Sequence, residues 1–227
     1  MAAEWMRAIF EEARAHGLTT AIITDGHTTP EALDLLAPVT DVVRVDLKAL
    51  DDRGYRTLGG RLDPVLDTLA RAKAMGFWVE VVTLVVPGLN DDPRGLEEMG
   101  AALARLDPDM PWHLNAAQPR YRHEAPPPPT ELLLSVAGAA YARGVRYVYV
   151  GNVPAASALA HTRCPGCHAV TVRRVDFRTT HARIERGLCP ECRAPLAGLW
   201  DARAAAIRRG SSGVEDRAPR REASGLE

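Results

Sequence analysis

The sequence predicts an α/β protein in which a parallel sheet is followed by a small module containing four cysteines. Helical patterns alternate with short apolar runs from residue 3 to residue 150, and all four cysteines fall within residues 161–195. Strict alternation of helix and strand implies parallel strands joined by right-handed crossovers. The apolar runs are nearly continuous, so we expect both faces of the sheet to be covered.

The helices are predicted from apolar spacing and from their terminal residues. The first helical pattern stops at Gly17, a residue type that suits the position after a helix. Thr29-Pro30, Asp63-Pro64 and Asp92-Pro93 each resemble an N-cap followed by a proline in the first turn. The predicted helices cover residues 3–16, 30–37, 64–75, 93–106 and 130–143.

The strands are predicted from five short apolar runs between these helices. They are residues 19–23, 42–46, 78–86, 112–115 and 146–150, with a loop expected between residue 47 and the third helix. Ligands of such folds meet the loops at the carboxyl ends of the strands. Five units are too few to close an eight-stranded barrel, so a complete open sheet and the back half of a barrel are equally compatible with the pattern.

Composition limits the classes of partner. The chain has 227 residues, of which 46 % are hydrophobic, and a net charge of -1, which gives no general argument for a nucleic acid or membrane partner. No apolar run approaches the roughly 20 residues of a spanning helix, and the start predicts an amphipathic helix rather than a signal peptide. We therefore predict a cytoplasmic protein that does not contact membranes or nucleic acid.

Two charged residues stand at the end of the second predicted strand. Asp46 and Lys48 flank Leu47, so their side chains point to the same side of an extended strand. Lys48 and Lys73 are the only lysines of the chain, which makes a lysine at a strand end informative. The pair is suited to a zwitterionic or cationic ligand, and a structural ion pair is the alternative.

Other polar residues of the strand ends are less specific. Thr24-Asp25-Gly26 and Pro87-Gly88 have the residue types of ordinary turns. His113 follows Trp112 within a strand and is expected to be packed, whereas His27 and His123, in loops, are freer to transfer protons.

The cysteines have the spacing of a zinc ribbon. CPGC and CPEC, separated by 21 residues, offer four thiolates to one tetrahedral ion, and the chain shows no export signal that would favour disulfides. We predict a structural zinc site formed by Cys164, Cys167, Cys189 and Cys192, with rubredoxin-type iron as the alternative. The predicted module covers residues 160–200.

Several motifs occur together in one order: ITDG, VDLKAL, GGRLDPVLDTL, VEVVTLVVPGLND, PWHLN and RYVYVGNVP, followed by CPGC and CPEC. This set, from about residue 4 to Trp200, resembles a radical SAM enzyme of the AmmeMemoRadiSam system, a relative of pyruvate formate-lyase activating enzyme. The resemblance implies that residues 1–155 are the C-terminal part of a partial (βα) barrel. Residues 203–227 match nothing, and we expect a disordered tail there.

The resemblance also implies a chemistry. The family uses a [4Fe-4S] cluster on a CxxxCxxC loop, an electron donor and S-adenosylmethionine to make a 5′-deoxyadenosyl radical that abstracts hydrogen from a protein or small-molecule substrate. AmmeMemoRadiSam-system proteins are the implied partners. The implied cofactor contacts are Thr24, Asp25, Gly26, Asp46, Lys48, Thr83, Pro87 and Gly88. Asp25 replaces the usual asparagine and so exchanges an amide donor for an acceptor.

The sequence also departs from the family in its cysteines. It has no CxxxCxxC loop, and its four cysteines all belong to the predicted ribbon. We therefore expect an N-terminally truncated chain that is inactive alone and has no assigned catalytic residue. The alternatives are a non-catalytic binding module, made of a degenerate half-barrel and a zinc ribbon, and an unrelated α/β enzyme that uses Asp46 and Lys48 for imine or phosphate chemistry.

Overall fold

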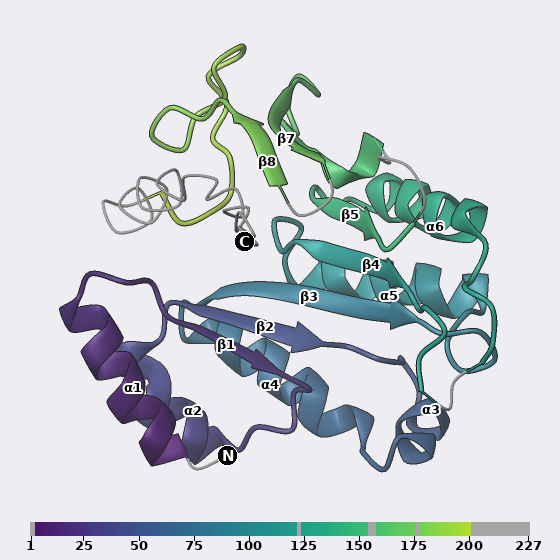
Figure 1. Cartoon of the computed structure of the whole chain (residues 1–227), viewed down its shortest axis with the longest axis horizontal. Coiled ribbons are helices and arrows are strands. Elements are labelled where there is room, and N and C mark those ends of the chain that lie inside the picture. Colours follow the sequence, from purple (N-terminus) through teal and green to yellow (C-terminus); the bar gives the residue numbers. More distant parts are fainter. Residues whose placement is uncertain (1–2, 122–123, 154–157, 176–177, 201–227) are drawn as a thin grey trace, which may run out of the picture.

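The protein contains a five-stranded parallel sheet with helices and a separate three-stranded antiparallel sheet (Figure 1). This computed structural model describes residues 3–121, 124–153, 158–175 and 178–200. The parallel strands lie in chain order and are β1 (Ala21–Thr24), β2 (Val42–Asp46), β3 (Trp78–Val85), β4 (Trp112–Ala116) and β5 (Val148–Gly151). The predicted α/β fold with parallel strands is confirmed. The predicted tail lies outside the described residues.

The helices connect successive strands. They are α1 (Ala3–Ala15), α2 (Pro30–Leu36), α3 (Asp52–Thr57), α4 (Leu62–Ala74), α5 (Pro93–Leu106) and α6 (Thr130–Ala142), with short 3₁₀ turns at Ala37–Val39 and Ala158–Ala160. The hydroxyl of Thr29 accepts a hydrogen bond from the Ala32 amide at the start of α2, as its sequence predicts. The short helix α3 replaces part of the expected loop, because the Asp51 carboxylate accepts a hydrogen bond from the Gly54 amide.

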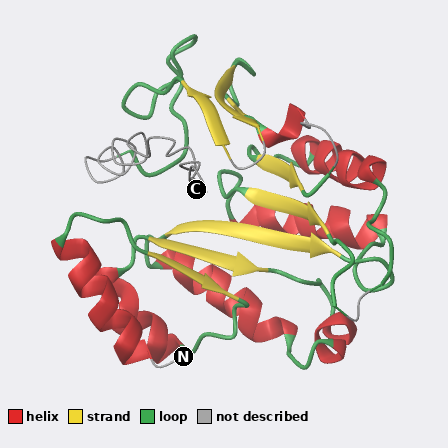
Figure 2. Cartoon of the chain, in the orientation of Figure 1, coloured by secondary structure: helices red, strands yellow, loops and turns green. Residues whose placement is uncertain are grey.

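The helices cover only one face of the parallel sheet (Figure 2). Along β2 and beyond it, Val43, Val45 and Leu47 are buried, whereas the side chains between them are partly exposed. The prediction that both faces are covered by helices is therefore wrong. We call the uncovered side the open face; its polar members include Arg44, Asp46, Lys48, Glu80, His113 and Tyr149.

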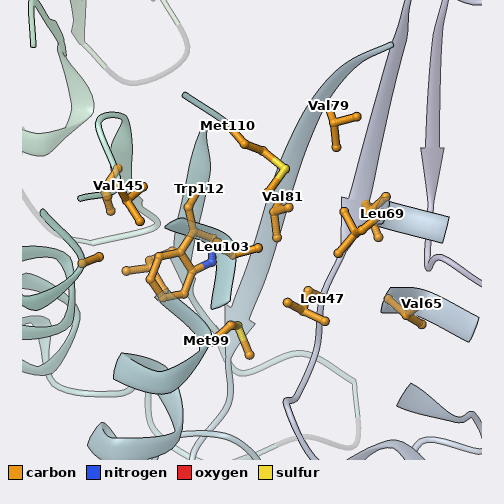
Figure 3. Packing of buried hydrophobic residues seen from close by; sticks show 14 of the residues in the cluster. Leu47, Val65, Leu69, Val79, Val81, Met99, Leu103, Met110, Trp112 and Val145 are labelled. Atoms are coloured by element: carbon orange, nitrogen blue, oxygen red, sulfur yellow. The ribbon is translucent and has the colours of Figure 1, made fainter. Parts of the chain in front are cut away.

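The core between sheet and helices is organised around one buried tryptophan. Trp112 has no exposed surface, and its indole Nε1 donates to Thr83 Oγ1 at 2.9 Å. The Thr83 hydroxyl in turn donates to the Leu47 carbonyl at 2.9 Å, so β4, β3 and the end of β2 are joined through hydrogen bonds inside the core. Figure 3 shows Trp112 among the buried hydrophobic side chains of this core. A buried hydrogen bond that satisfies each partner fixes the relative positions of these strands.

The antiparallel sheet belongs to the cysteine-containing module. Its strands β6 (Thr162–Arg163), β7 (Val170–Val175) and β8 (Arg178–Ala182) pair in that order. We call residues 162–200 the ribbon. The ribbon contacts the parallel sheet through Tyr149 Oη, which lies 3.0 Å from Thr162 Oγ1, and through the Ala197 amide, which donates to Tyr147 Oη at 3.0 Å.

One edge of the parallel sheet is exposed. β1 is an outer strand that pairs only with β2 among the described residues, and the Ile23 side chain is 64 % exposed. The described helices include none long and apolar enough to cross a membrane.

Gly26 allows the turn after β1 to pack against α4. Its φ is +88°, and a Cβ there would lie 2.7 Å from Val65 Cγ1. We expect Gly26→Ala to lower the free energy of unfolding by about 3 kcal/mol, because backbone strain and overpacking add. The control Gly76→Ala, at φ +83° with nothing within 4 Å, should cost about 1 kcal/mol through strain alone. Urea denaturation measures both, and equal losses would contradict the packing argument.

Candidate functional site

An ion pair stands at the carboxyl end of β2 on the open face. Lys48 Nζ lies 3.2 Å from Asp46 Oδ2, and about a third of each side chain is exposed. The other carboxylate oxygen, Asp46 Oδ1, is buried and has no hydrogen-bond partner among the described residues. A buried acceptor without a donor is costly, so this oxygen offers a position for a ligand N–H group.

Two side chains hold the backbone of Lys48. The Lys48 amide donates to Tyr55 Oη at 3.1 Å, and the Lys48 carbonyl accepts from Asn90 Nδ2 at 2.6 Å. Asn90 Nδ2 also donates to the Leu84 carbonyl at 2.8 Å, so one amide joins the ends of β2 and β3. Sequence reasoning missed both residues. The polar asparagine in the turn after β3 was a signal for such a role, whereas nothing local marked Tyr55.

The turn after β1 is held mainly by its own side chains. The Gly26 amide donates to Thr24 Oγ1 at 3.1 Å, and the His27 amide donates to Asp25 Oδ1 at 3.1 Å. Thr24 is the register partner of Val45, one residue before Asp46, so this turn and the ion pair occupy neighbouring strand ends. Asp25 therefore acts as a turn acceptor, and its carboxylate is 63 % exposed.

Of the other predicted cofactor contacts, Pro87 and Gly88 lie near the ion pair and the Thr83 side chain does not. Thr83 is fully buried, and its hydroxyl bonds within the helix-facing core, on the opposite side of the sheet from Asp46 and Lys48. The turn after β3 contains Pro87 and Gly88, and the Gly88 amide donates to Asp91 Oδ1 at 2.9 Å. The structure thus places Thr24–Gly26, the ion pair and Pro87–Gly88 at one edge of the sheet, and it places the Thr83 side chain elsewhere.

The four cysteine sulfurs form one cluster. All four Sγ atoms lie within 4.8 Å of one another. The Cys164–Cys192 and Cys167–Cys189 pairs are 3.6 and 3.7 Å apart. A tetrahedral Zn–S₄ site with bonds of about 2.3 Å has sulfurs about 3.8 Å apart, so the cluster fits a single ion. The predicted module of four clustered cysteines is confirmed.

The two cysteine turns have the same backbone hydrogen bonds. The amides of Cys164 and Cys189 donate to carbonyls five residues later, and the carbonyls of the same cysteines accept from His168 and Arg193, four residues later. His168 and Arg193 both have positive φ, 61° and 63°. The amides of Cys192 and Glu191 help to lower the pKa of the Cys189 thiol to about 7, while hydrogen bonds between the sulfurs raise the pKa of Cys167 to about 12. Without a metal the four sulfurs thus share protons, and the thiolate is favoured at Cys189.

A second polar group lies on the open face, nearer the starts of the strands. His113 Nε2 is 3.1 Å from Glu80 Oε2, and the His113 ring stacks on Tyr149 with a centroid distance of 4.9 Å. His113 is thus both stacked and hydrogen-bonded to an acid. Of the two loop histidines, His27 accepts from the Arg61 amide through Nε2 at 3.1 Å, and His123 lies outside the described residues.

Comparison with protein families identifies the part of the chain that contains the strand-end residues. Residues 1–98 match the radical SAM superfamily model. This part of the chain is therefore similar to the radical SAM superfamily. The matched residues include the Thr24–Gly26 turn, the ion pair and Pro87–Gly88, while the ribbon lies outside them.

Two curated proteins are also similar to this chain. The uncharacterized protein MJ0808 of Methanocaldococcus jannaschii is 33 % identical over 191 residues, which cover 79 % of this chain and 54 % of the relative. The isethionate sulfite-lyase activating enzyme of Oleidesulfovibrio alaskensis is 27 % identical over 112 residues, or 47 % of this chain and 36 % of the relative. The chain therefore spans about half the length of the first relative and about a third of the second.

A solved structure has a similar fold. It is a domain of pyruvate-formate lyase-activating enzyme from Bacteroides vulgatus, with a TM-score of 0.56 and 15 % identity. The match covers 66 % of this chain and 91 % of that one. At this identity the likeness concerns the fold alone.

The ribbon should depend on a bound metal ion for its folding. We expect Cys189→Ser to release the ion and to unfold residues 160–200 while the parallel sheet remains folded, because metal binding supplies much of the folding free energy of such a small module. Elemental analysis and hydrogen exchange measure the two effects. His168→Asn, which keeps a residue tolerant of positive φ at that position, should retain the metal. Unchanged metal content in Cys189→Ser would rule out the four-thiolate site.

Proposed function

We propose that this chain is the C-terminal part of an activating-enzyme-like radical SAM protein of the AmmeMemoRadiSam type. The Asp46–Lys48 pair on the open face of the matched domain is the observation that supports this most directly. The similarity to an isethionate sulfite-lyase activating enzyme agrees with it. The proposed partners are an electron donor, a protein or small-molecule substrate, and other proteins of that system.

The residues of the strand ends fit the amino-acid part of S-adenosylmethionine. Asp46 Oδ1 is a buried acceptor without a partner among the described residues, and an ammonium group would satisfy it. Lys48 would then hold the carboxylate of the same ligand, since its side chain is about one-third exposed beside Asp46. Tyr55 and Asn90, which bond to the backbone of Lys48, would keep the pair in position.

The residues of this chain do not fit the [4Fe-4S] cluster of the family. All four cysteines lie in the ribbon, where their sulfurs form one cluster suited to one ion. We propose that the radical cluster is ligated by residues outside these 227, in a preceding segment or in another chain. The bound cofactor would supply the radical that abstracts hydrogen; this chain would bind and orient it.

We propose zinc as the ion of the ribbon. The spacing of the sulfurs suits both zinc and rubredoxin-type iron. Two CPxC turns separated by 21 residues are more typical of structural zinc.

Metal analysis separates the proposed function from a non-catalytic binding module. We expect anaerobically purified product of the complete gene to contain iron, sulfide and zinc, and this chain alone to contain zinc without sulfide. Translation of the DNA upstream of Met1 should reveal CxxxCxxC within about a hundred residues, the length of two βα units and their loops. A product without iron and sulfide, and no such motif upstream or in a partner gene, would favour the binding module.

The ion pair should determine affinity for the cofactor. In the complete gene product, we expect Asp46→Asn and Lys48→Gln each to weaken S-adenosylmethionine binding about tenfold, because each removes one charged contact. Equilibrium dialysis measures this directly.

The matched control is Lys73→Gln. Lys73 is the other lysine of the chain and is also ion-paired, to Asp107 at 2.5 Å, but it lies on α4. Its substitution should leave cofactor affinity unchanged. Equal losses in Lys48→Gln and Lys73→Gln would show that the strand-end pair has no specific role.

A further inference from the structure

A cavity of about 910 Å³ separates the open face from the ribbon. The sheet contributes Trp78, Glu80, His113 and Tyr149 to its wall, and the ribbon contributes Arg174 and His181. Its volume is in the range of small-molecule sites, which combine aromatic walls with a few polar groups. Among the described residues that line it, Glu80 is the only acid and Arg174 the only arginine or lysine.

The carboxylate of Glu80 is already matched by donors. Trp78 Nε1 donates to Oε1 at 2.9 Å, and His113 Nε2 lies 3.1 Å from Oε2. Burial raises the pKa of Glu80, but the hydrogen bonds from His113 and Trp78 and the nearby charges of His113 and Arg44 outweigh it, and the net effect lowers the pKa. Glu80 is therefore an anion at neutral pH whose two oxygens have partners, so the cavity does not require a cationic ligand.

Arg174, the cation of the cavity, is less fully paired than Glu80. Arg174 Nη1 donates to Thr162 Oγ1 at 2.8 Å and to the Ala160 carbonyl at 3.2 Å, and the guanidinium lies 5.4 Å from the Tyr149 ring centroid. These contacts hold the side chain in place, yet no carboxylate of the described residues forms an ion pair with it. A guanidinium held in this way is suited to a planar oxyanion such as a carboxylate.

The aromatic side chains shape the rest of the cavity. The rings of His113 and Tyr149 are stacked at 4.9 Å with an angle of 20° between them, and Trp78 is fixed by its bond to Glu80. The His113 and Arg174 contacts already occupy the Tyr149 ring, so the fixed indole of Trp78 is the aromatic surface of this wall that favours a flat, stacked ligand. With Nε2 of His113 directed to Glu80, the ring has Nδ1 as its second polar atom, an acceptor in the neutral ring and a donor in the charged one.

We propose that this cavity is a binding site for a planar small molecule bearing a carboxylate, which stacks on the aromatic wall and pairs with Arg174. The site is built from two modules, because Glu80, His113 and Tyr149 belong to the parallel sheet and Arg174 to the ribbon. It goes beyond the proposed function: neither Asp46 nor Lys48 lines the cavity, and the site requires neither S-adenosylmethionine nor an iron–sulfur cluster.

Three probes test the charge and the shape of the ligand on the unmutated chain. They are 2-naphthoate, 2-naphthamidine with the same rings and the opposite charge, and cyclohexanecarboxylate with the same charge and no flat ring. We expect calorimetry to show 2-naphthoate binding at least about tenfold more tightly than either of the others. Preference for 2-naphthamidine, equal binding of all three, or no binding of 2-naphthoate at millimolar concentration would overturn the proposal.

A pair of neighbouring arginines on β7 locates the site. Arg174→Gln should weaken 2-naphthoate binding about tenfold, because it removes the cation of the cavity. Arg173→Gln is the matched control, since Arg173 is exposed and does not line the cavity; it should leave affinity unchanged. Circular dichroism and metal content verify that both variants fold. Equal affinity of Arg174→Gln and Arg173→Gln for 2-naphthoate would refute the role of Arg174. The comparison of the three probes tests the ligand class independently, because it uses the unmutated chain.

Discussion

Helices cover only one side of the parallel sheet, and this constraint decides where every other feature of the structure lies. Side chains alternate along a strand, so Val43, Val45 and Leu47 enter the core, while Arg44, Asp46 and Lys48 face away from it. The core side is closed by the hydrogen bonds of Trp112 and Thr83. The polar groups that could bind ligands are consequently on the other side of the sheet. There the Asp46–Lys48 pair and the cavity between sheet and ribbon share the open face.

The elements of the fold were predictable because their signals are local. Proline after an N-capping residue marked α2 and α5, and the two CPxC turns marked the ribbon. Contacts between distant residues were not predictable. Asn90 bonds to Lys48, and Glu80 to His113, across 42 and 33 positions of the chain. The side of the sheet on which Thr83 lies depends on strand phase, which the apolar run of β3 does not reveal.

The ribbon has two roles that its sequence does not separate. Its four cysteines are placed to bind one metal ion, which would stabilise the fold of the ribbon itself. The two cysteine turns have the same backbone hydrogen bonds, as expected if they share that ion. The other side of the ribbon presents Thr162 and Arg174 to Tyr149 of the sheet. A module that is too small to have much of a core is thereby able to hold an arginine over an aromatic ring, which in a flexible loop would cost far more side-chain entropy.

The outer strand β1 has a consequence for the behaviour of the protein at high concentration. Its sequence, Ala-Ile-Ile-Thr, contains neither a charge nor a proline, and Ile23 is largely exposed. Edge strands that lack such guards are templates for pairing with other strands. These four residues therefore form an unguarded edge of the described sheet, and a single lysine on the outward side of β1 would oppose its pairing with another strand.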